Sequence, residues 1–282
     1  MTGTGTTKGG WELPITEAQL ARLTRDMEQA HRDTLPAMRA SAVDLAEEIR
    51  TRRAECGEAD QGRRRFLMGL GGVGAALVLA ACSSDPKTTN AVTSPSASGG
   101  SAKASASASA SASGQYTGDL KVVALATALE NQAVGAYQAA LDAATAGKLG
   151  TVPPAVATFV TTAMAQHADH AKAWNAVLTG AGKPAITDVP LSNQADVTAA
   201  LGKVTDVGGV AELALQLEDQ AAQTYLFATY NVTSPAGIAT AATIAPVEAM
   251  HAAILHYVLG QYPVPDDFLP VDKAAKPSLL TV

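Results

Sequence analysis

The chain has 282 residues, a formal net charge of −6 at pH 7 and only 4 % aromatic residues. Residues 1–81 carry eleven basic and eleven acidic side chains, whereas residues 82–282 carry nine basic and fifteen acidic ones. An acidic second part without Lys/Arg clusters excludes nucleic acid as a partner, because phosphate contacts need such clusters. The scarcity of aromatic residues and the many alanines disfavour a β-sandwich and favour helices.

The segment 62–82 has the order of an export signal. Three arginines, 63–65, precede an apolar run over 66–81, and Cys82 follows directly. This run is shorter than the stretch of about 20 apolar residues that a membrane-spanning helix needs. It suits the central part of a signal peptide.

Two short patterns in this segment carry a resemblance to known signals. Arg63, Arg64, Phe66 and Leu67 resemble the twin-arginine export motif, and the Leu-Ala-Ala-Cys sequence that ends at Cys82 resembles a bacterial lipobox. The resemblance implies export in a folded state by the twin-arginine machinery, with diacylglycerol on the thiol of Cys82. We therefore expect a protein held by a lipid anchor at the extracytoplasmic face of the membrane, with an uncleaved signal anchor as the alternative.

The segments on either side of the signal differ in character. Residues 1–61 are expected to form a cytosolic head of unknown function, with a helix over 16–55 that breaks near Pro36; an overcalled start codon is the alternative. Residues 83–115 are dominated by Ser and Ala, so they cannot bury a core and are expected to form a disordered tether.

Residues 116–265 are expected to form one all-α domain, with 266–282 as a C-terminal tail. Gly, Pro and Ser mark helix ends. They predict helices over 117–147, 151–180, 206–230 and 234–260, with a short helix near 195–203 in a longer middle connection. This arrangement predicts a four-helix bundle.

The domain also repeats itself. The sequence 129–133 recurs at 217–221, and the Glu of each copy is followed seven residues later by a tyrosine. The segment 167–171 aligns in the same way with 248–252. The bundle is therefore predicted to consist of two repeated helical hairpins that build a symmetric site between them.

Six ionisable side chains fall on the apolar faces of the four helices: Glu130, His167, His170, Glu218, Glu248 and His251. A buried, unpaired carboxylate costs several kcal/mol, and these faces hold no Lys or Arg that could compensate. A cation bound by carboxylates and imidazoles offsets this cost, so the sequence predicts a metal site. We expect Tyr137 and Tyr225 to donate hydrogen bonds behind the ligands. His31 and His256 are given no role, and His256 is expected to be exposed.

The order of these residues resembles the ferritin-like di-metal carboxylate family, in which two helices each give one Glu and two others each give Glu-x-x-His. Among its members the domain is most similar to the ferritin-like lipoproteins of actinobacteria. The resemblance implies iron, as two ions, and oxidation of Fe(II) or reaction with O₂ or peroxide; manganese is an alternative.

One position departs from the family pattern. His167 stands where the family has a bridging Glu. A single ion or zinc therefore stays open, since imidazole also suits zinc. The alternative function is a metal-free or mononuclear bundle with a structural, stress-protection or metal-delivery role in the cell envelope. Enzymatic activity and the choice between monomer and dimer are also left open.

Overall fold

The computed structural model describes residues 11–69, 115–264 and 270–282. The chain divides into two compact units, one of residues 1–53 with 112–282 and the other of residues 54–111. The proposed lipidation site Cys82 and all but residue 115 of the predicted tether lie outside the described residues.

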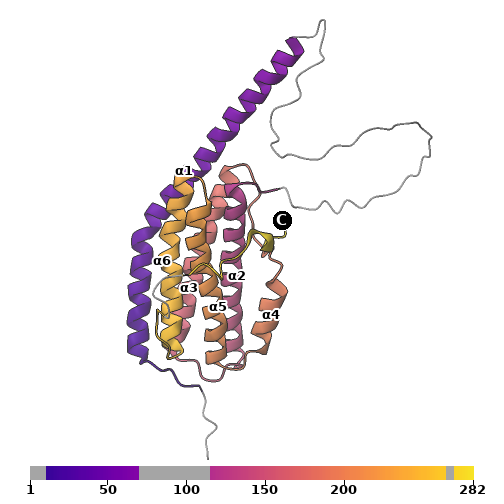
Figure 1. The fold of residues 1–282 in the computed structure, drawn as a ribbon. Helices are drawn as coiled ribbons and strands as arrows, with labels where there is room; N and C mark the ends of the chain where they lie inside the picture. Colours follow the sequence, from indigo (N-terminus) through magenta and orange to yellow (C-terminus); the bar gives the residue numbers. More distant parts are fainter. Residues whose placement is uncertain (1–10, 70–114, 265–269) are drawn as a thin grey trace, which may run out of the picture. The chain divides into compact units, whose positions relative to one another are not determined.

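The first unit is built around four long helices, α2 (Asp119–Thr145), α3 (Pro154–Gly180), α5 (Val207–Asn231) and α6 (Pro235–Val258), which run side by side (Figure 1). A shorter helix, α4 (Gln194–Lys203), lies in the middle connection, and a 3-10 turn, η1 (Pro277–Leu279), lies near the C-terminus. The described residues form no β-strand. The prediction of an all-α helical bundle is confirmed.

The helix ends lie close to the predicted positions because local sequence sets them. The side chains of Asp206 and Ser234 accept hydrogen bonds from the backbone N–H groups of Gly209 and Gly237, at 2.8 and 3.2 Å, and so cap α5 and α6. After α2, Gly147 adopts a φ of 72°, a left-handed conformation that ends a helix readily only at glycine.

The N-terminal helix α1 (Glu17–Gly69) is continuous through Pro36, so the predicted break is wrong. A proline within a helix costs about 3 kcal/mol. Met27 on one side of it and Met38 and Leu45 on the other are at most 2 % exposed. Burial of this apolar stripe offsets the cost of the proline.

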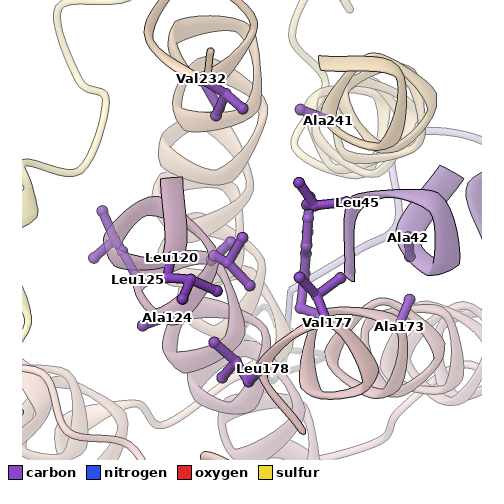
Figure 2. Close-up of a cluster of buried hydrophobic side chains, with 14 of the residues drawn as sticks. Ala42, Leu45, Leu120, Ala124, Leu125, Ala173, Val177, Leu178, Val232 and Ala241 are labelled. Atoms are coloured by element: carbon purple, nitrogen blue, oxygen red, sulfur yellow. The ribbon is translucent and has the colours of Figure 1, made fainter. Parts of the chain in front are cut away.

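The stripe on α1 packs against α3 and α6. Figure 2 shows Ala42 and Leu45 of α1 beside Ala173 and Val177 of α3, with Ala241 of α6 nearby. Residues 17–53 thus form a fifth helix in the same unit as the bundle.

Polar contacts also fasten α1 to the bundle. Arg39 Nη2 lies 2.8 Å from Asp169 Oδ1, and Ser41 Oγ lies 2.7 Å from Thr240 Oγ1. Ser234 Oγ, which caps α6, lies 2.5 Å from Glu48 Oε2. These contacts join α1 to both hairpins.

In the part of the chain that the structure describes, α6 is long and apolar enough to cross a membrane by length and composition alone. Half of this apolar stretch is buried inside the bundle. A core helix has the same properties, and α6 packs against α5 within the bundle.

Candidate metal centre

The structure brings the six predicted residues together at the middle of the bundle, each at most 2 % exposed: Glu130, His167, His170, Glu218, Glu248 and His251. Two positions on α3 and two on α6 are spaced by three residues, which places each pair on one helix face. The helices α2 and α5 each give one glutamate.

His167 connects Glu130 of α2 with Glu218 of α5. Its Nδ1 lies 2.7 Å from Glu130 Oε2 and its Nε2 lies 3.0 Å from Glu218 Oε1. One imidazole therefore touches both halves of the repeated structure.

The remaining histidines each approach two carboxylates. His251 Nδ1 lies 3.2 Å from both Glu218 Oε2 and Glu248 Oε2. His170 Nδ1 lies 2.9 Å from Glu248 Oε1 and 3.5 Å from Glu130 Oε1. Although they are close, His170 Nδ1 and Glu248 Oε1 do not have hydrogen-bonding geometry, and each lacks a hydrogen-bond partner. Both atoms are free to take a common ligand.

Two overlapping groups of these residues could each hold a metal ion. The first is Glu130, His167, His170 and Glu248, and the second is His167, Glu218, Glu248 and His251. Within each group the potential ligand atoms lie within 4.8 Å of one another. His167 and Glu248 belong to both groups, so each could face two ions.

The histidines and glutamates shift one another's pKa values. Burial alone would raise the pKa of Glu130, but His170 and His167 lower it to about 2. Burial alone would lower the pKa of His170, but Glu130 and Glu248 raise it to about 9. Glu248 and Glu218 raise the pKa of His167 well above its usual value in the same way. Protons on the imidazoles can therefore balance carboxylate charge without a metal, and a metal ion has to displace them.

Two tyrosines hold the single glutamates from behind. The hydroxyl of Tyr225 donates to Glu130, and that of Tyr137 donates to Glu218. Both tyrosines therefore make the hydrogen bonds expected from the sequence. Trp174 Nε1 donates to the Tyr225 hydroxyl at 2.8 Å, which extends this chain of hydrogen bonds away from the centre.

A pocket between α2 and α5 reaches the centre. Glu130 and His167 lie at this pocket, whose wall includes the small side chains Ala126, Ala133 and Ala221. A small ion or molecule in this pocket would lie next to Glu130 and His167.

The structure also adds residues that the sequence analysis missed. Gln166 Oε1 lies 2.8 Å from His251 Nε2, and Gln166 Nε2 donates at 2.8 Å to Glu28 of α1. His31 of α1 is 3 % exposed, and its ring centroid lies 5.3 Å from that of His170. The helical spacing of His31 from buried Met27 and Met38 was the available signal.

The expectation for His256 is wrong. Its side chain is 6 % exposed, and its Nδ1 lies 2.8 Å from Gln261 Oε1. Its neighbours Ile254, Leu255 and Val258 are also buried, so this part of α6 is covered on several faces and the angular position of His256 could not indicate its burial.

A family model for the ferritin-like domain matches residues 118–261, a span that contains all six residues of the centre. The chain belongs to the ferritin-like domain family. No curated protein and no solved structure matches the chain.

Proposed function

We propose that the chain is a metal-binding protein whose centre takes two divalent first-row ions, with iron as the physiological metal. The observation that carries the proposal is the pair His170 Nδ1 and Glu248 Oε1, which are buried, 2.9 Å apart and without hydrogen-bond partners. The two atoms form an ion pair that lacks hydrogen-bonding geometry, and a metal ion between them would satisfy both. Carboxylate oxygen and imidazole nitrogen suit iron, manganese and zinc.

The six residues would be shared between two ion positions. Glu130 and His170 serve one ion, Glu218 and His251 serve the other, and His167 and Glu248 stand between them. Iron bound there would supply one-electron chemistry toward O₂ or peroxide, including oxidation of further Fe(II) as substrate. The protein side chains fix the carboxylates through the two tyrosine hydroxyls and exclude water by burial.

A metal-free bundle is the second candidate, and a specific observation favours it. The pKa values of His167 and His170 are raised, whereas those of Glu130 and Glu218 are lowered. These shifts favour protonated imidazoles beside ionised carboxylates. The cluster can therefore be neutralised by protons alone. In that case the bundle has a structural role.

Metal content of the purified full chain separates these candidates. The chain is expressed with iron, manganese and zinc available, and metals are counted by elemental mass spectrometry. Because Glu248 belongs to both groups, Glu248→Ala should remove both ions, whereas the matched control Glu212→Ala, at an exposed site on α5, should keep them.

Each other outcome corrects the proposal in a defined way. One ion in the wild type contradicts a two-ion centre and leaves a mononuclear binding protein. No metal, with intact helical circular dichroism, leaves the metal-free bundle. Unchanged metal content in Glu248→Ala contradicts the assigned site.

We further propose that the chain is exported by the twin-arginine machinery and anchored through lipid on Cys82. Support comes from the order of the motif, apolar run and cysteine in residues 62–82. The packing of residues 17–53 on the bundle requires both on one side of a membrane, so these contacts belong to the chain before export. A machinery that moves folded proteins is compatible with them.

Export is tested in a bacterial host that has the twin-arginine pathway. The double variant Arg63→Lys/Arg64→Lys should keep the full-length chain in the cytosol, whereas Arg65→Lys should not. Cys82→Ser should abolish incorporation of radiolabelled fatty acid. Lipid labelling that survives Cys82→Ser, or normal export of the double variant, contradicts the proposal.

A further inference from the structure

A row of hydrogen-bonded side chains connects the candidate metal centre to α1. His251 Nε2 lies 2.8 Å from Gln166 Oε1, and Gln166 Nε2 donates at 2.8 Å to Glu28 Oε2. The second oxygen of Glu28 accepts from Arg32 Nε at 2.5 Å. His251 is 0 % exposed and Gln166 1 %, whereas 30 % of the Glu28 side chain is exposed. The row therefore runs from a fully buried imidazole to a carboxylate that reaches solvent.

The carboxylate of Glu28 fixes the direction of every hydrogen bond in this row. Although burial opposes ionisation, hydrogen bonds from Gln166 and Arg32 keep the pKa of Glu28 below its usual value. An ionised carboxylate only accepts hydrogen bonds. The amide of Gln166 must therefore present its NH₂ group to Glu28 and its oxygen to His251. Nε2 of His251 must then carry a proton, because an amide oxygen cannot donate.

The other ring nitrogen of His251 faces the centre. Its Nδ1 lies 3.2 Å from both Glu218 Oε2 and Glu248 Oε2. A histidine that donates one ring N–H to a fixed acceptor has the opposite nitrogen oriented toward a metal. Nδ1 is therefore the nitrogen left for an ion, while Nε2 keeps its proton in the hydrogen bond to Gln166.

This arrangement is present in one half of the repeated structure. In the alignment of 167–171 with 248–252, Gln166 corresponds to Val247, a buried apolar side chain that can neither donate nor accept. His251 belongs only to the second of the two groups that could hold an ion. A change in the row of hydrogen bonds should therefore act on one ion position and leave the other as it is.

We propose that Glu28 of α1 is a positioning residue of the metal centre, which acts through Gln166 to keep Nδ1 of His251 available to the ion at the second group. The inference rests on the proposed metal-binding function. Glu28 lies outside the span 118–261 that the ferritin-like family model matches, so α1 contributes to a centre whose six candidate ligands all lie inside that span. If cleavage before Cys82 removes residues 1–81, this ion is held less tightly afterwards.

The first variant, Glu28→Gln, keeps the shape of the side chain but leaves it a single acceptor oxygen. When Arg32 takes that oxygen, the new NH₂ group faces Gln166, and the Gln166 amide turns its own NH₂ group toward His251. Nε2 of His251 then has to accept, and its proton moves to Nδ1, where it competes with an ion. We expect one of the two ion positions to weaken by about tenfold, the lower end of the effect of such outer partners.

Exchanging the two residues should restore the direction of the hydrogen bonds. In Glu28→Gln/Gln166→Glu, the carboxylate at position 166 accepts from His251, and the amide at position 28 donates to it while its oxygen accepts from Arg32. We expect this double variant to bind both ions at least as tightly as the wild type. A role in packing alone predicts no difference between the single and double variants, because Glu and Gln have the same shape. Glu47→Gln, at an exposed site on α1, is the matched control and should leave both positions unchanged.

Two measurements on the full chain follow affinity and ring orientation separately. Co²⁺ alone is titrated and followed by visible absorbance, with stoichiometry from elemental analysis. Zn²⁺, which is diamagnetic, is used for long-range proton–nitrogen NMR correlation spectra of the histidine rings. In the wild type and the double variant, the His251 ring should show a metal-bound Nδ1 and a proton on Nε2 that exchanges slowly with solvent. This proton should exchange faster in Glu28→Gln.

The outcomes distinguish this inference from the function on which it rests. If Glu28→Gln binds two Co²⁺ ions with wild-type affinity, or if the double variant is as weak as the single one, the inference is wrong and the metal-binding function stands. The same holds if the His251 ring binds Zn²⁺ through Nε2. If the wild type binds no Co²⁺, both are wrong.

Discussion

Replacing Tyr225 by phenylalanine removes one hydroxyl from the middle of a chain of hydrogen bonds. That hydroxyl donates to the buried carboxylate of Glu130 and accepts from Trp174 Nε1 at 2.8 Å. Losing a hydrogen bond to a charged group costs about 1.5–3 kcal/mol, and a buried N–H without an acceptor costs about 1–3 kcal/mol. Because neighbouring losses do not add fully, we expect Tyr225→Phe to lower the free energy of unfolding by about 3 kcal/mol.

Tyr137 offers a matched comparison within the same molecule. Its hydroxyl donates to Glu218 in the corresponding position of the repeat. Among the hydrogen bonds of the described residues, it has no counterpart of the Trp174 bond. Tyr137→Phe should therefore cost about 2 kcal/mol, roughly 1 kcal/mol less than Tyr225→Phe.

The assay is urea denaturation of the metal-free full chain at pH 7, followed by circular dichroism, for the wild type, both single variants and the double variant. Equal costs for the two single variants would refute the role given to the Trp174 bond. Costs below about 0.5 kcal/mol for both would refute the hydrogen bonds to the buried carboxylates, because such values are typical of surface substitutions.

Three further predictions concern α1 and pH. Leu45→Ala, at a side chain with 0 % exposure between α1 and the bundle, should cost about 2–5 kcal/mol in urea denaturation, whereas Val43→Ala, at 59 % exposure, should cost almost nothing; equal effects would contradict the packing of α1. In the metal-free chain the raised pKa of His170 stabilises the fold below pH 6.5, and this contribution is lost as the pH rises through about 9. The lowered pKa of Glu130 stabilises the fold above pH 4.5, and that contribution is lost as the pH falls through about 2. Burial lowers the pKa of His31 to about 4, so its contribution is lost as the pH falls below 6.5. The urea midpoint should therefore be highest near pH 6.5, and a midpoint that rises from pH 7 to 10 would contradict this. Zn²⁺ affinity, measured by competition with a chelator, should increase from pH 6 to about 9 because the ion competes with the proton on His170; an affinity independent of pH would argue against His170 as a ligand.

The six residues of the candidate centre could be predicted because their signals are local. Helical spacing places Glu248 and His251 on one face, and the repeat places Glu130 opposite Glu218 at the same depth of the bundle. The sequence also identified His167 as the departure from the family pattern. It could not show that Glu248 would be shared by both groups, because this depends on how the two hairpins dock.

The role of α1 could not be predicted for a different reason. The segment proposed as an export signal and the Ser/Ala-rich segment stand between residues 17–53 and the bundle in the sequence, so residues 1–61 were expected to lie apart from the bundle. His31 contacts His170 through tertiary packing, and no local pattern connects the two positions. Pro36 was interpreted as a helix break because the apolar stripe on α1 stabilises the helix only when it is buried against the bundle. The sequence does not show that burial.

The hydrogen bond between Trp174 and Tyr225 gives the protein a built-in optical reporter. Only two hydrogen bonds, both made by the Tyr225 hydroxyl, separate the indole of Trp174 from the carboxylate of Glu130. A change of charge at that carboxylate therefore alters the surroundings of the fluorophore. The chain has one other tryptophan, Trp11, and Trp11→Phe would leave Trp174 as the single source of tryptophan emission. Events at the centre can then be followed in solution, in real time, without adding a dye.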